Sequence, residues 1–311
     1  MNNIICIAGP TASGKTALAA TLAKELNGEV VSCDSMQVYK RMDIGTAKPT
    51  LEEMQGIPHH MIDVAEPWED FSVSRYCDMA APIVDDILSR GKTAVIAGGT
   101  GLYMDSLIRG NAFAPFPATG VRERLEAQAD TVGMEVMLSQ LRSVDPDAAG
   151  RLHLSDRKRI LRALEVWYET GETITQHDHR TRQQAPRYRA AYIGLSFQDR
   201  AQLRRRIDLR VDKMLDAGLL DEAKLVYDHR QTYRTAAQAI GYKQFLAAAD
   251  GRCTVTEAIE EVKLRSRQYA KRQLTWLRRN PDIHWILWGE EPNFPRGLQN
   301  ATEYLTALGL R

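Results

Sequence analysis

A glycine-rich segment near the first residue has the composition of a phosphate-binding loop. Residues 9–16 read Gly-Pro-Thr-Ala-Ser-Gly-Lys-Thr, fit the pattern G-x-x-x-x-G-K-[ST], follow an apolar run at 4–8 and open a helical stretch at 16–26. In such a loop the backbone N–H groups point at a phosphate, the lysine supplies positive charge, and the last hydroxyl is placed for Mg²⁺. We expect phosphate contacts from Gly9, Pro10, Thr11, Ala12, Ser13, Gly14, Lys15 and Thr16, with Thr16 beside the metal.

The residues that follow two other apolar runs narrow the chemistry. A P-loop kinase or NTPase uses a second strand-end carboxylate for Mg²⁺, but the run at 94–97 leads into Gly-Gly-Thr-Gly at 98–101, which has no acid. The strand-end carboxylate nearby is Asp34, after the run at 30–33. Asp34 could contact the metal, act as a general base, or only cap the next turn. This pattern fits a simple ATPase poorly, and the loop alone does not identify the phosphate ester.

Short apolar runs and helical stretches alternate along the first third of the chain. Runs at 4–8, 29–33 and 93–97 are separated by helical stretches at 16–26 and around 74–89. This order and spacing predict an α/β fold, in which helices flank a parallel sheet. Ligands bind along one edge of such sheets, at the loops that follow the strands.

A helical region interrupts this pattern after Pro115 and Pro117. Residues 120 to about 170 look wholly helical, with Ser155 as a suitable N-cap and Gly171 as a suitable end for the last helix. A polar stretch at 173–187 then follows without strand signals. The buried stripe expected for the last helix is Ile160, Leu161, Leu164, Trp167 and Tyr168.

The strand pattern returns at 190–195 and continues with helices near 199–217 and 256–279 and a strand-like tail at 284–288. We therefore expect a P-loop α/β core with basic C-terminal helices, made of residues 1–112 and 188–311. Residues 113–187 would form a mainly helical insertion, and this insertion would contact the macromolecule on which the core acts. The residues after 280 have no role that the sequence indicates.

The formal net charge of +1 hides an asymmetry along the chain. Residues 1–112 carry nine Lys and Arg against fourteen Asp and Glu, whereas residues 200–280 carry eighteen against ten. A basic half suits a nucleic-acid partner, because Lys and Arg neutralise phosphates. A solvated helix surface would have the same composition, so charge alone leaves both interpretations open.

Other patterns argue against several classes of protein. The four cysteines include no Cys-x-x-Cys pair, and His59-His60 and His177-x-His179 lack the spacing and further ligands of a zinc site. The chain does not begin like a signal peptide, and no apolar run approaches the ~18 residues of a membrane span. We expect a cytoplasmic monomer without membrane contact.

Eight short motifs occur in an order that resembles the tRNA dimethylallyltransferases, the IPP transferase family. Beyond the loop at 9–16 they are Asp-Ser-Met-Gln-Val-Tyr at 34–39, Asp-Ile-Gly-Thr-Ala-Lys-Pro at 43–49, Pro-His-His-Met-Ile-Asp at 58–63, Gly-Gly-Thr-Gly-Leu-Tyr at 98–103, and segments at 156–165, 239–243 and 267–276. The resemblance spans roughly residues 4 to 279. Eight motifs in register are far more specific than a P-loop alone.

The resemblance implies transfer of a dimethylallyl group from dimethylallyl diphosphate to the exocyclic amine of the adenosine 3′ to the anticodon, in tRNAs reading codons that begin with U. Asp34 would accept the amine proton. Arg210, with Lys15 and Mg²⁺ near Thr16, would stabilise the departing diphosphate. Thr100 would lie near the reacting nucleotide or bridge to the diphosphate. Arg206 precedes Arg210 by one helical turn, on the same face.

The implied macromolecular partner is the tRNA anticodon stem-loop, whose adenosine must be flipped out of its stack to react. The strand around it needs phosphate contacts and stacking surfaces. Residues 263–279 include seven basic residues and no acidic one, like charges that a polyanion would offset. We expect tRNA contacts from Asp34, Ser35, Met36, Gln37, Thr100, Arg122, Lys158, Arg159, Ile160, Leu161, Arg162, Ala239, Ile240, Gly241, Tyr242, Lys243, Arg267, Lys271 and Arg272.

Two other functions stay open at this point. A P-loop kinase of a small metabolite would consume ATP and need no RNA, but the missing second carboxylate and the basic C-terminal helix count against it. A non-catalytic RNA-binding protein that uses nucleotide as a switch would return its RNA unmodified, whether or not Asp34 is replaced.

Overall fold

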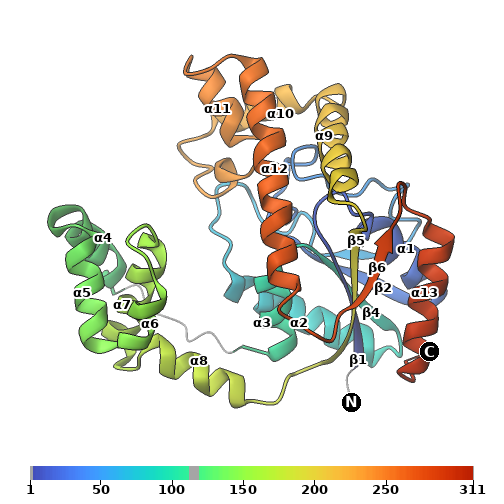
Figure 1. The fold of residues 1–311 in the computed structure, drawn as a ribbon, viewed down its shortest axis with the longest axis horizontal. Coiled ribbons are helices and arrows are strands. Elements are labelled where there is room, and N and C mark those ends of the chain that lie inside the picture. The colour runs from blue at the N-terminus through green and yellow to red at the C-terminus, as the bar shows by residue number, and fades with distance from the viewer. Residues whose placement is uncertain (1–2, 112–118, 311) are drawn as a thin grey trace. The chain divides into compact units, whose positions relative to one another are not determined.

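A parallel β-sheet forms the centre of the larger of two compact units. The computed structural model describes residues 3–111 and 119–310, and its sheet has the order β3-β2-β4-β1-β5-β6 with every neighbouring pair parallel (Figure 1). The α/β fold that the sequence predicts is confirmed, including its last strand. The strands are β1 (Asn3–Ala8), β2 (Gly28–Cys33), β3 (His59–His60), β4 (Thr93–Gly98), β5 (Arg189–Phe197) and β6 (His284–Trp288).

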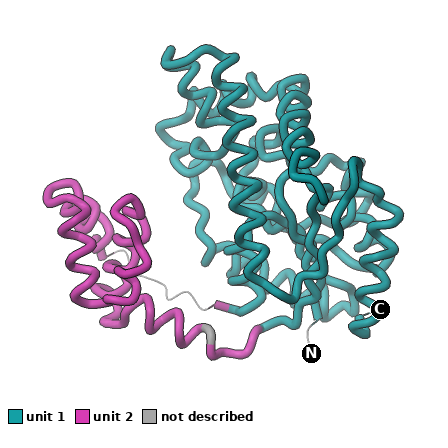
Figure 2. Tube along the Cα trace, in the orientation of Figure 1, with its two compact units in different colours: residues 1–110, 187–311 teal, residues 111–186 magenta. Residues whose placement is uncertain are grey.

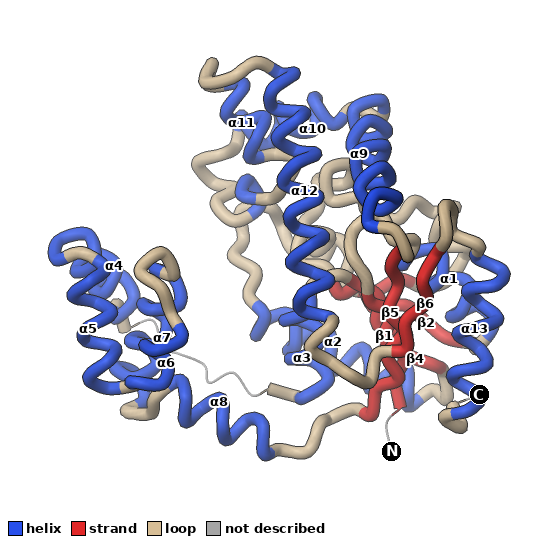
Figure 3. The backbone as a smooth tube through the Cα atoms, viewed as in Figure 1, coloured by secondary structure: helices blue, strands red, loops and turns tan. Residues whose placement is uncertain are grey.

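Helices flank this sheet, as the blue and red segments of Figure 3 show. The α-helices of the larger unit are α1 (Lys15–Glu25), α2 (Val73–Ser89), α3 (Gly101–Arg109), α9 (Arg200–Asp216), α10 (Leu219–Asp228), α11 (Lys243–Ala249), α12 (Val255–Leu277) and α13 (Phe294–Ala307), and α10 and α11 pack on α9 and α12. The two long helices expected near 199–217 and 256–279 are α9 and α12, whereas α3, α10, α11 and α13 were not expected. None of the helices in the described ranges combines the length and apolar composition that a membrane crossing requires.

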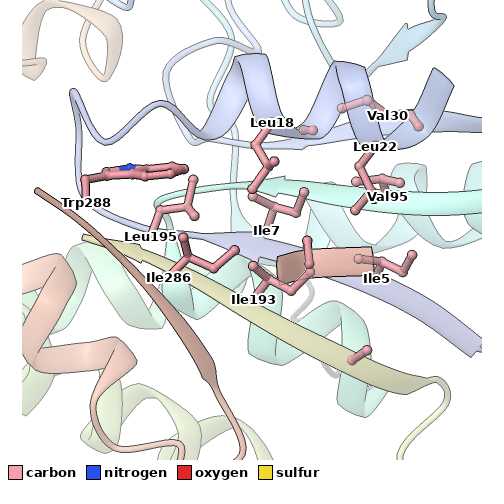
Figure 4. Close-up of a cluster of buried hydrophobic side chains, with 14 of the residues drawn as sticks. Ile5, Ile7, Leu18, Leu22, Val30, Val95, Ile193, Leu195, Ile286 and Trp288 are labelled. Atoms are coloured by element: carbon pink, nitrogen blue, oxygen red, sulfur yellow. The ribbon is translucent and has the colours of Figure 1, made fainter. Parts of the chain in front are cut away.

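The hydrophobic core lies directly behind the phosphate-binding loop. β1 pairs with β4 on one side and β5 on the other, and its residues 4–8 are all buried. A strand enclosed in this way has a continuous apolar run instead of an alternating one. Its Ile5 and Ile7 pack with Val95, Ile193 and neighbouring residues of the cluster shown in Figure 4. Each large aliphatic side chain buried there contributes roughly 1.5–3 kcal/mol, which holds the end of β1 and the following loop in place.

In its described residues, a second compact unit contains helices and no strand. Contacts divide the chain into residues 1–110 with 187–311 and residues 111–186, coloured separately in Figure 2. The boundary that we expected between 112 and 113 lies outside the described residues. The second unit has its own apolar cluster, which includes Leu125, Met137, Leu141 and Leu164. Its helices are α4 (Val121–Val132), α5 (Met134–Val144), α6 (Pro146–Arg151), α7 (Arg157–Thr170) and α8 (Ile174–Gln183).

Two expectations for this unit need correction, and the structure adds one helix that the sequence did not delimit. Asp156, not Ser155, occupies the N-cap position of α7, and its carboxylate accepts a hydrogen bond from the His153 backbone N–H. Tyr168 is 50% exposed, because it lies on the outer face of α7 beneath the Arg124 guanidinium. The polar stretch after Gly171 contains α8, which begins at a capping box formed by Thr173 and Gln176.

Glu29 is a buried carboxylate at the beginning of β2. Its side chain is 4% exposed and accepts hydrogen bonds from Arg90 at 2.6 Å, Lys92 at 2.7 Å and His60 at 2.8 Å. The Arg90 guanidinium, assisted by Lys92 and His60, holds the pKa of Glu29 well below its usual range despite burial. A carboxylate whose pKa is lower in the folded than in the unfolded chain stabilises the fold above the unfolded pKa.

We predict that Glu29→Gln lowers the free energy of unfolding by about 1–3 kcal/mol at pH 7, because three charge-assisted hydrogen bonds are weakened. The difference from wild type should shrink as the pH falls below about 4.3, the pKa of an unfolded glutamate, since wild-type Glu29 then loses its advantage. Denaturant unfolding at several pH values measures this. Glu69→Gln, at a more exposed Arg75 pair, is the control and should change little. A difference for Glu29→Gln that is as large at pH 3 as at pH 7 would contradict this explanation.

Candidate active site

A cavity of about 350 Å³ lies at the carboxyl ends of β1, β2 and β4. The loop after β1 contributes Thr11, Lys15 and Thr16, and the turn after β2 contributes residues 34–37. The cavity therefore brings together the phosphate-binding loop, Asp34 and Arg210 from three distant parts of the chain. From α9 and α12 it is lined by Ile207, Arg210, Val211, Met214, Val262, Ser266, Tyr269, Arg272 and Gln273.

The phosphate-binding loop leaves the amino end of α1 open. Gly14, at the N-cap position, has φ +86° and gives the helix no side-chain cap, so N–H groups of the first turn are available to an anion. Gly9 is required by close packing, because a Cβ there would lie 2.7 Å from the Leu195 carbonyl oxygen and from Ser13 Oγ. The Lys15 ammonium donates to the Pro10 carbonyl at 2.9 Å.

Positive charge exceeds negative charge in this cavity. Burial, as the larger cause, and the nearby Arg210 guanidinium together lower the pKa of Lys15 to about 8, against the opposing effect of Asp34. Burial also lowers the pKa of Arg210. Asp34 is the one acid among the described residues that line the cavity. Two buried cations with one carboxylate form a site that an anion would stabilise.

Asp34 caps a turn and also faces the cavity. Its Oδ1 accepts the Met36 and Gln37 backbone N–H groups, at 2.9 and 3.4 Å, and no described residue donates to Oδ2. The turn is held by Thr100, whose Oγ1 accepts the Ser35 N–H at 3.2 Å. Thr100 thus positions the Asp34 turn from the end of β4, and it also hydrogen-bonds Tyr269, whose pKa burial raises to about 12.

The glycines of the Gly-Gly-Thr-Gly segment allow helix α12 to pack closely against the end of β4. Gln273 Oε1 accepts the Thr11 N–H and its Nε2 donates to the Gly99 carbonyl, both at 3.0 Å. A Cβ on Gly99 would lie 2.1 Å from Gln273 Nε2, and one on Gly101 would lie 2.2 Å from the Trp276 ring. The position after β4, where a P-loop kinase would have a metal-binding acid, contacts α12 in this protein. The role of Gln273 was not recognised from the sequence, because both of its partners lie far away along the chain.

A second loop forms the wall opposite the P-loop. The Glu222 carboxylate accepts the backbone N–H groups of residues 43–45 at 2.7–3.1 Å and the Tyr242 hydroxyl at 2.6 Å. Gly45 lies against the Tyr242 ring, where a Cβ would approach within 2.6 Å. Next to this wall, the described lining is apolar at Ile207, Val211, Met214, Ile240 and Val262. The cavity therefore joins an anion site to a hydrocarbon surface.

The residues of the core unit that were expected to contact tRNA differ in how accessible their side chains are. Ser35, Met36, Gln37, Ala239, Ile240, Gly241 and Arg272 line the cavity. The Gln37 amide already bonds Ser32, Thr46 and Ala47. Tyr242 is fully buried, so its side chain offers RNA no surface, whereas Lys243 and Lys271 are exposed.

The basic run on α12 is partly neutralised by the protein itself. Lys263 pairs with Asp212 at 2.8 Å and Arg267 with Asp208 at 2.5 Å, both on α9, and Arg265 pairs with Glu261 at 2.7 Å. The expectation that a polyanion must offset all seven charges is therefore wrong. Arg206 lies outside the cavity lining, where it pairs with Glu291 and covers the Phe197 ring.

In the helical unit, the charged residues expected to contact tRNA lie at the surface and the apolar ones do not. Arg122, Lys158 and Arg159 are exposed, and Arg162 pairs with Glu165 at 2.8 Å. Ile160 and Leu161 belong to the apolar cluster of this unit, with 0% and 7% exposure. Their side chains therefore stabilise the unit and do not offer a contact surface.

The fold and the cavity define a P-loop α/β protein whose cavity combines cationic and apolar lining residues. A family model described as IPP transferase matches residues 37–280. The chain belongs to this family, as the resemblance of its motifs indicated.

Relatives and solved structures agree with this assignment. A protein of Acetivibrio thermocellus named tRNA dimethylallyltransferase is 43% identical over 312 residues, which covers 100% of this chain and 99% of the relative. A protein of the same name from Carboxydothermus hydrogenoformans is 46% identical, with 93% of each chain covered. The full-length tRNA isopentenylpyrophosphate transferase of Bacillus halodurans is 40% identical with a TM-score of 0.74, covering 99% and 96%. A eukaryotic dimethylallyltransferase solved acting on tRNA is 30% identical with a TM-score of 0.82, covering 99% and 78%.

We predict that the affinity for inorganic diphosphate falls as the pH rises through about 8, the pKa of the Lys15 ammonium. Anion binding requires the charged lysine, so affinity should fall by up to about tenfold per pH unit above that value. Calorimetric titration from pH 7 to 9.5 measures the effect. Lys15→Arg stays charged throughout and controls for ionisation of the diphosphate. Identical pH profiles for the two proteins would show that Lys15 does not titrate in this range.

Proposed function

We propose that this protein transfers a dimethylallyl group from dimethylallyl diphosphate to the exocyclic amine of the adenosine 3′ to the anticodon, in tRNAs reading codons that begin with U. The observation that carries the proposal is the cavity in which Lys15, Arg210 and the P-loop adjoin an apolar wall and one carboxylate. A prenyl diphosphate has this combination of a hydrocarbon and two phosphates. The names of the relatives support transfer to tRNA.

Asp34 would act as the general base. The exocyclic amine of adenine is a weak nucleophile, because its lone pair is delocalised into the ring. As the bond from this nitrogen to the first prenyl carbon forms, the carbon–oxygen bond breaks and its electron pair leaves with the diphosphate. Asp34 Oδ2 would accept the amine proton, and the hydrogen bonds to Oδ1 hold the carboxylate in position.

Lys15, Arg210 and the N–H groups at the start of α1 would stabilise the leaving diphosphate. The sheet and α9 fix these groups before the reaction, so they need little reorganisation as negative charge develops on the leaving diphosphate. Arg210 also donates to the Ala47 carbonyl at 3.5 Å, which connects it to the loop at 43–47. Thr11 lines the same end of the cavity and would contact the diphosphate.

The residues present fit Mg²⁺ that is bound together with the diphosphate. Thr16 and Asp34 line the cavity, while within 3–111 and 119–310 no group of three or more His, Cys, Asp or Glu could hold a metal by itself. Mg²⁺ commonly keeps several waters and uses one or two carboxylates with substrate phosphates. Thr16 would hold the ion, which when bound would offset negative charge on the diphosphate.

A tRNA contact surface would extend along α9 and α12. A second cavity of about 450 Å³ between these helices is lined by Arg200, Arg204, Arg267, Lys271 and Arg278, with no acid among its described lining residues. Its apolar residues include Leu203 and Leu264. A strip of cations beside apolar surface suits a nucleic-acid backbone. Arg122, Lys158, Arg159 and Arg162 would add contacts from the helical unit. We expect the protein to act as a cytoplasmic monomer.

We predict that purified protein with unmodified tRNA, Mg²⁺ and dimethylallyl diphosphate yields an adenosine heavier by one dimethylallyl group, measured by mass spectrometry of the digested RNA. Asp34→Asn should lower turnover by ~10²–10⁴-fold with little change in tRNA affinity, because its amide oxygen can still cap the turn. Unchanged turnover would remove Asp34 from the mechanism. Unmodified RNA, together with ATP consumption and a phosphorylated small acceptor, would instead identify a kinase.

We predict that the double substitution Lys271→Gln and Arg278→Gln weakens tRNA binding and flattens its dependence on salt. Each lost phosphate contact reduces the slope of log affinity against log salt by about 0.7–0.9. Filter binding at several salt concentrations measures the slope. Lys24→Gln, at the far end of α1, is the control and should leave the slope unchanged. An unaltered slope in the double variant would exclude this surface as an RNA contact.

A further inference from the structure

The C-terminal segment makes direct contact with the phosphate-binding loop. It consists of β6 and α13, and it lies beyond the last residue that the family model matches. β6 pairs with β5 in parallel, from Ile193 with His284 to Phe197 with Trp288. This pairing places Trp288 at the carboxyl edge of the sheet. Trp288 lies at one end of the apolar cluster in Figure 4 and is itself 3% exposed.

The indole of Trp288 bonds the middle of the loop. Its Nε1 donates to the Ser13 carbonyl oxygen at 2.8 Å in a buried hydrogen bond. Phe294 packs against this indole with a centroid distance of 5.7 Å and an interplanar angle of 59°, and its ring would lie 3.1 Å from a Cβ on Gly14. The indole is in turn seated on Gly297, where a Cβ would approach it within 2.4 Å. The loop therefore rests on two aromatic rings that α13 supports.

This bond determines the direction of an N–H group. The Ser13 carbonyl and the Gly14 N–H belong to one planar trans peptide, in which they point to opposite sides. When Trp288 holds the carbonyl, the Gly14 N–H is held on the side of the loop away from Trp288. Gly14 has φ +86°, and a glycine can adopt many other backbone conformations. Without the bond from Trp288, the Ser13–Gly14 peptide would therefore be free to take other orientations. A loop amide that is oriented before the anion arrives contributes more to anion binding, because no free energy is spent on ordering it.

We propose that Trp288 is a positioning residue for diphosphate binding, and that it acts by fixing the Ser13–Gly14 peptide of the P-loop. Trp288 is not among the lining residues of the cavity, so it would act on the substrate only through the loop. Phe294 assists it by packing against both the indole and Gly14. The inference rests on the proposed function, because it assigns the P-loop to the diphosphate of the prenyl donor.

Trp288→Phe tests the proposal, because it keeps an aromatic ring and removes the N–H donor. We expect its affinity for inorganic diphosphate, measured by calorimetry with Mg²⁺, to fall about 3- to 10-fold, as for the loss of one hydrogen bond. In the transfer assay, KM for dimethylallyl diphosphate should rise by a similar factor, while KM for tRNA stays unchanged. Trp285→Phe is the matched control, since Trp285 lies on the same strand and packs on Gly194 instead of the loop.

Equal diphosphate affinity in Trp288→Phe and wild type would overturn the proposal. An equal loss of tRNA and diphosphate affinity would also overturn it, because general destabilisation would then be the cause. If Trp288→Phe does not fold, Phe294→Leu replaces it: weaker diphosphate binding with unchanged tRNA binding supports the proposal, and unchanged diphosphate binding refutes it. Failure of the wild type to bind diphosphate would reject the proposed function itself. That measurement uses no variant, so it is separate from the test of Trp288.

Discussion

Uncompensated positive charge in a largely buried cavity is the constraint on which the rest of this structure depends. Lys15 and Arg210 repel each other and lose hydration, and Asp34 offsets only part of that cost. Such a pair persists only when well-packed elements hold both side chains in place. β1, enclosed by β4 and β5, anchors the loop that contains Lys15. α9 anchors Arg210, and an incoming diphosphate would supply the missing negative charge.

Helix α12 connects this charged site to the surface of the molecule. With 3.6 residues per turn, Tyr269 and Gln273 lie on the face toward the cavity, whereas Lys271 and Arg278 lie on the opposite face. Gln273 ties the helix to both the P-loop and the end of β4. A displacement of α12 would therefore move the Thr11 N–H. A molecule bound on the outer face of α12 and the geometry of the cavity on its inner face are connected through this one helix.

The parts of the site that the sequence predicts are those with a local pattern. Glycines and a lysine at fixed spacing identify the P-loop, and the α/β order places Asp34 beside it, since strand ends share one edge. Arg210 came only from family resemblance. Gln273, Glu222 and Trp288 could not be predicted in the same way, because each bonds backbone atoms far away in the sequence. Such bonds leave no periodicity or motif.

The errors have equally specific causes. The charges of Lys263 and Arg267 looked unbalanced because their partners, Asp212 and Asp208, lie on α9 and not on α12. Ile160 and Leu161 looked like contacts because they belong to a family motif, although that motif includes core positions. Helix α8 was missed because its residues are polar on every side. Its start depends on a capping box, a two-residue signal that is easily overlooked.

The hydrogen bond from Trp288 to Ser13 joins residues 275 positions apart, and the bond from Gln273 to Thr11 joins residues 262 positions apart. During synthesis the P-loop leaves the ribosome before both of its supports are made. β1 also waits for β5, which follows the whole helical unit. Contacts of such long range form late, because loop closure precedes any gain from them. The nascent chain therefore contains the complete glycine–lysine motif long before the contacts that support it, and β6 and α13 supply the contacts of Trp288 and Phe294.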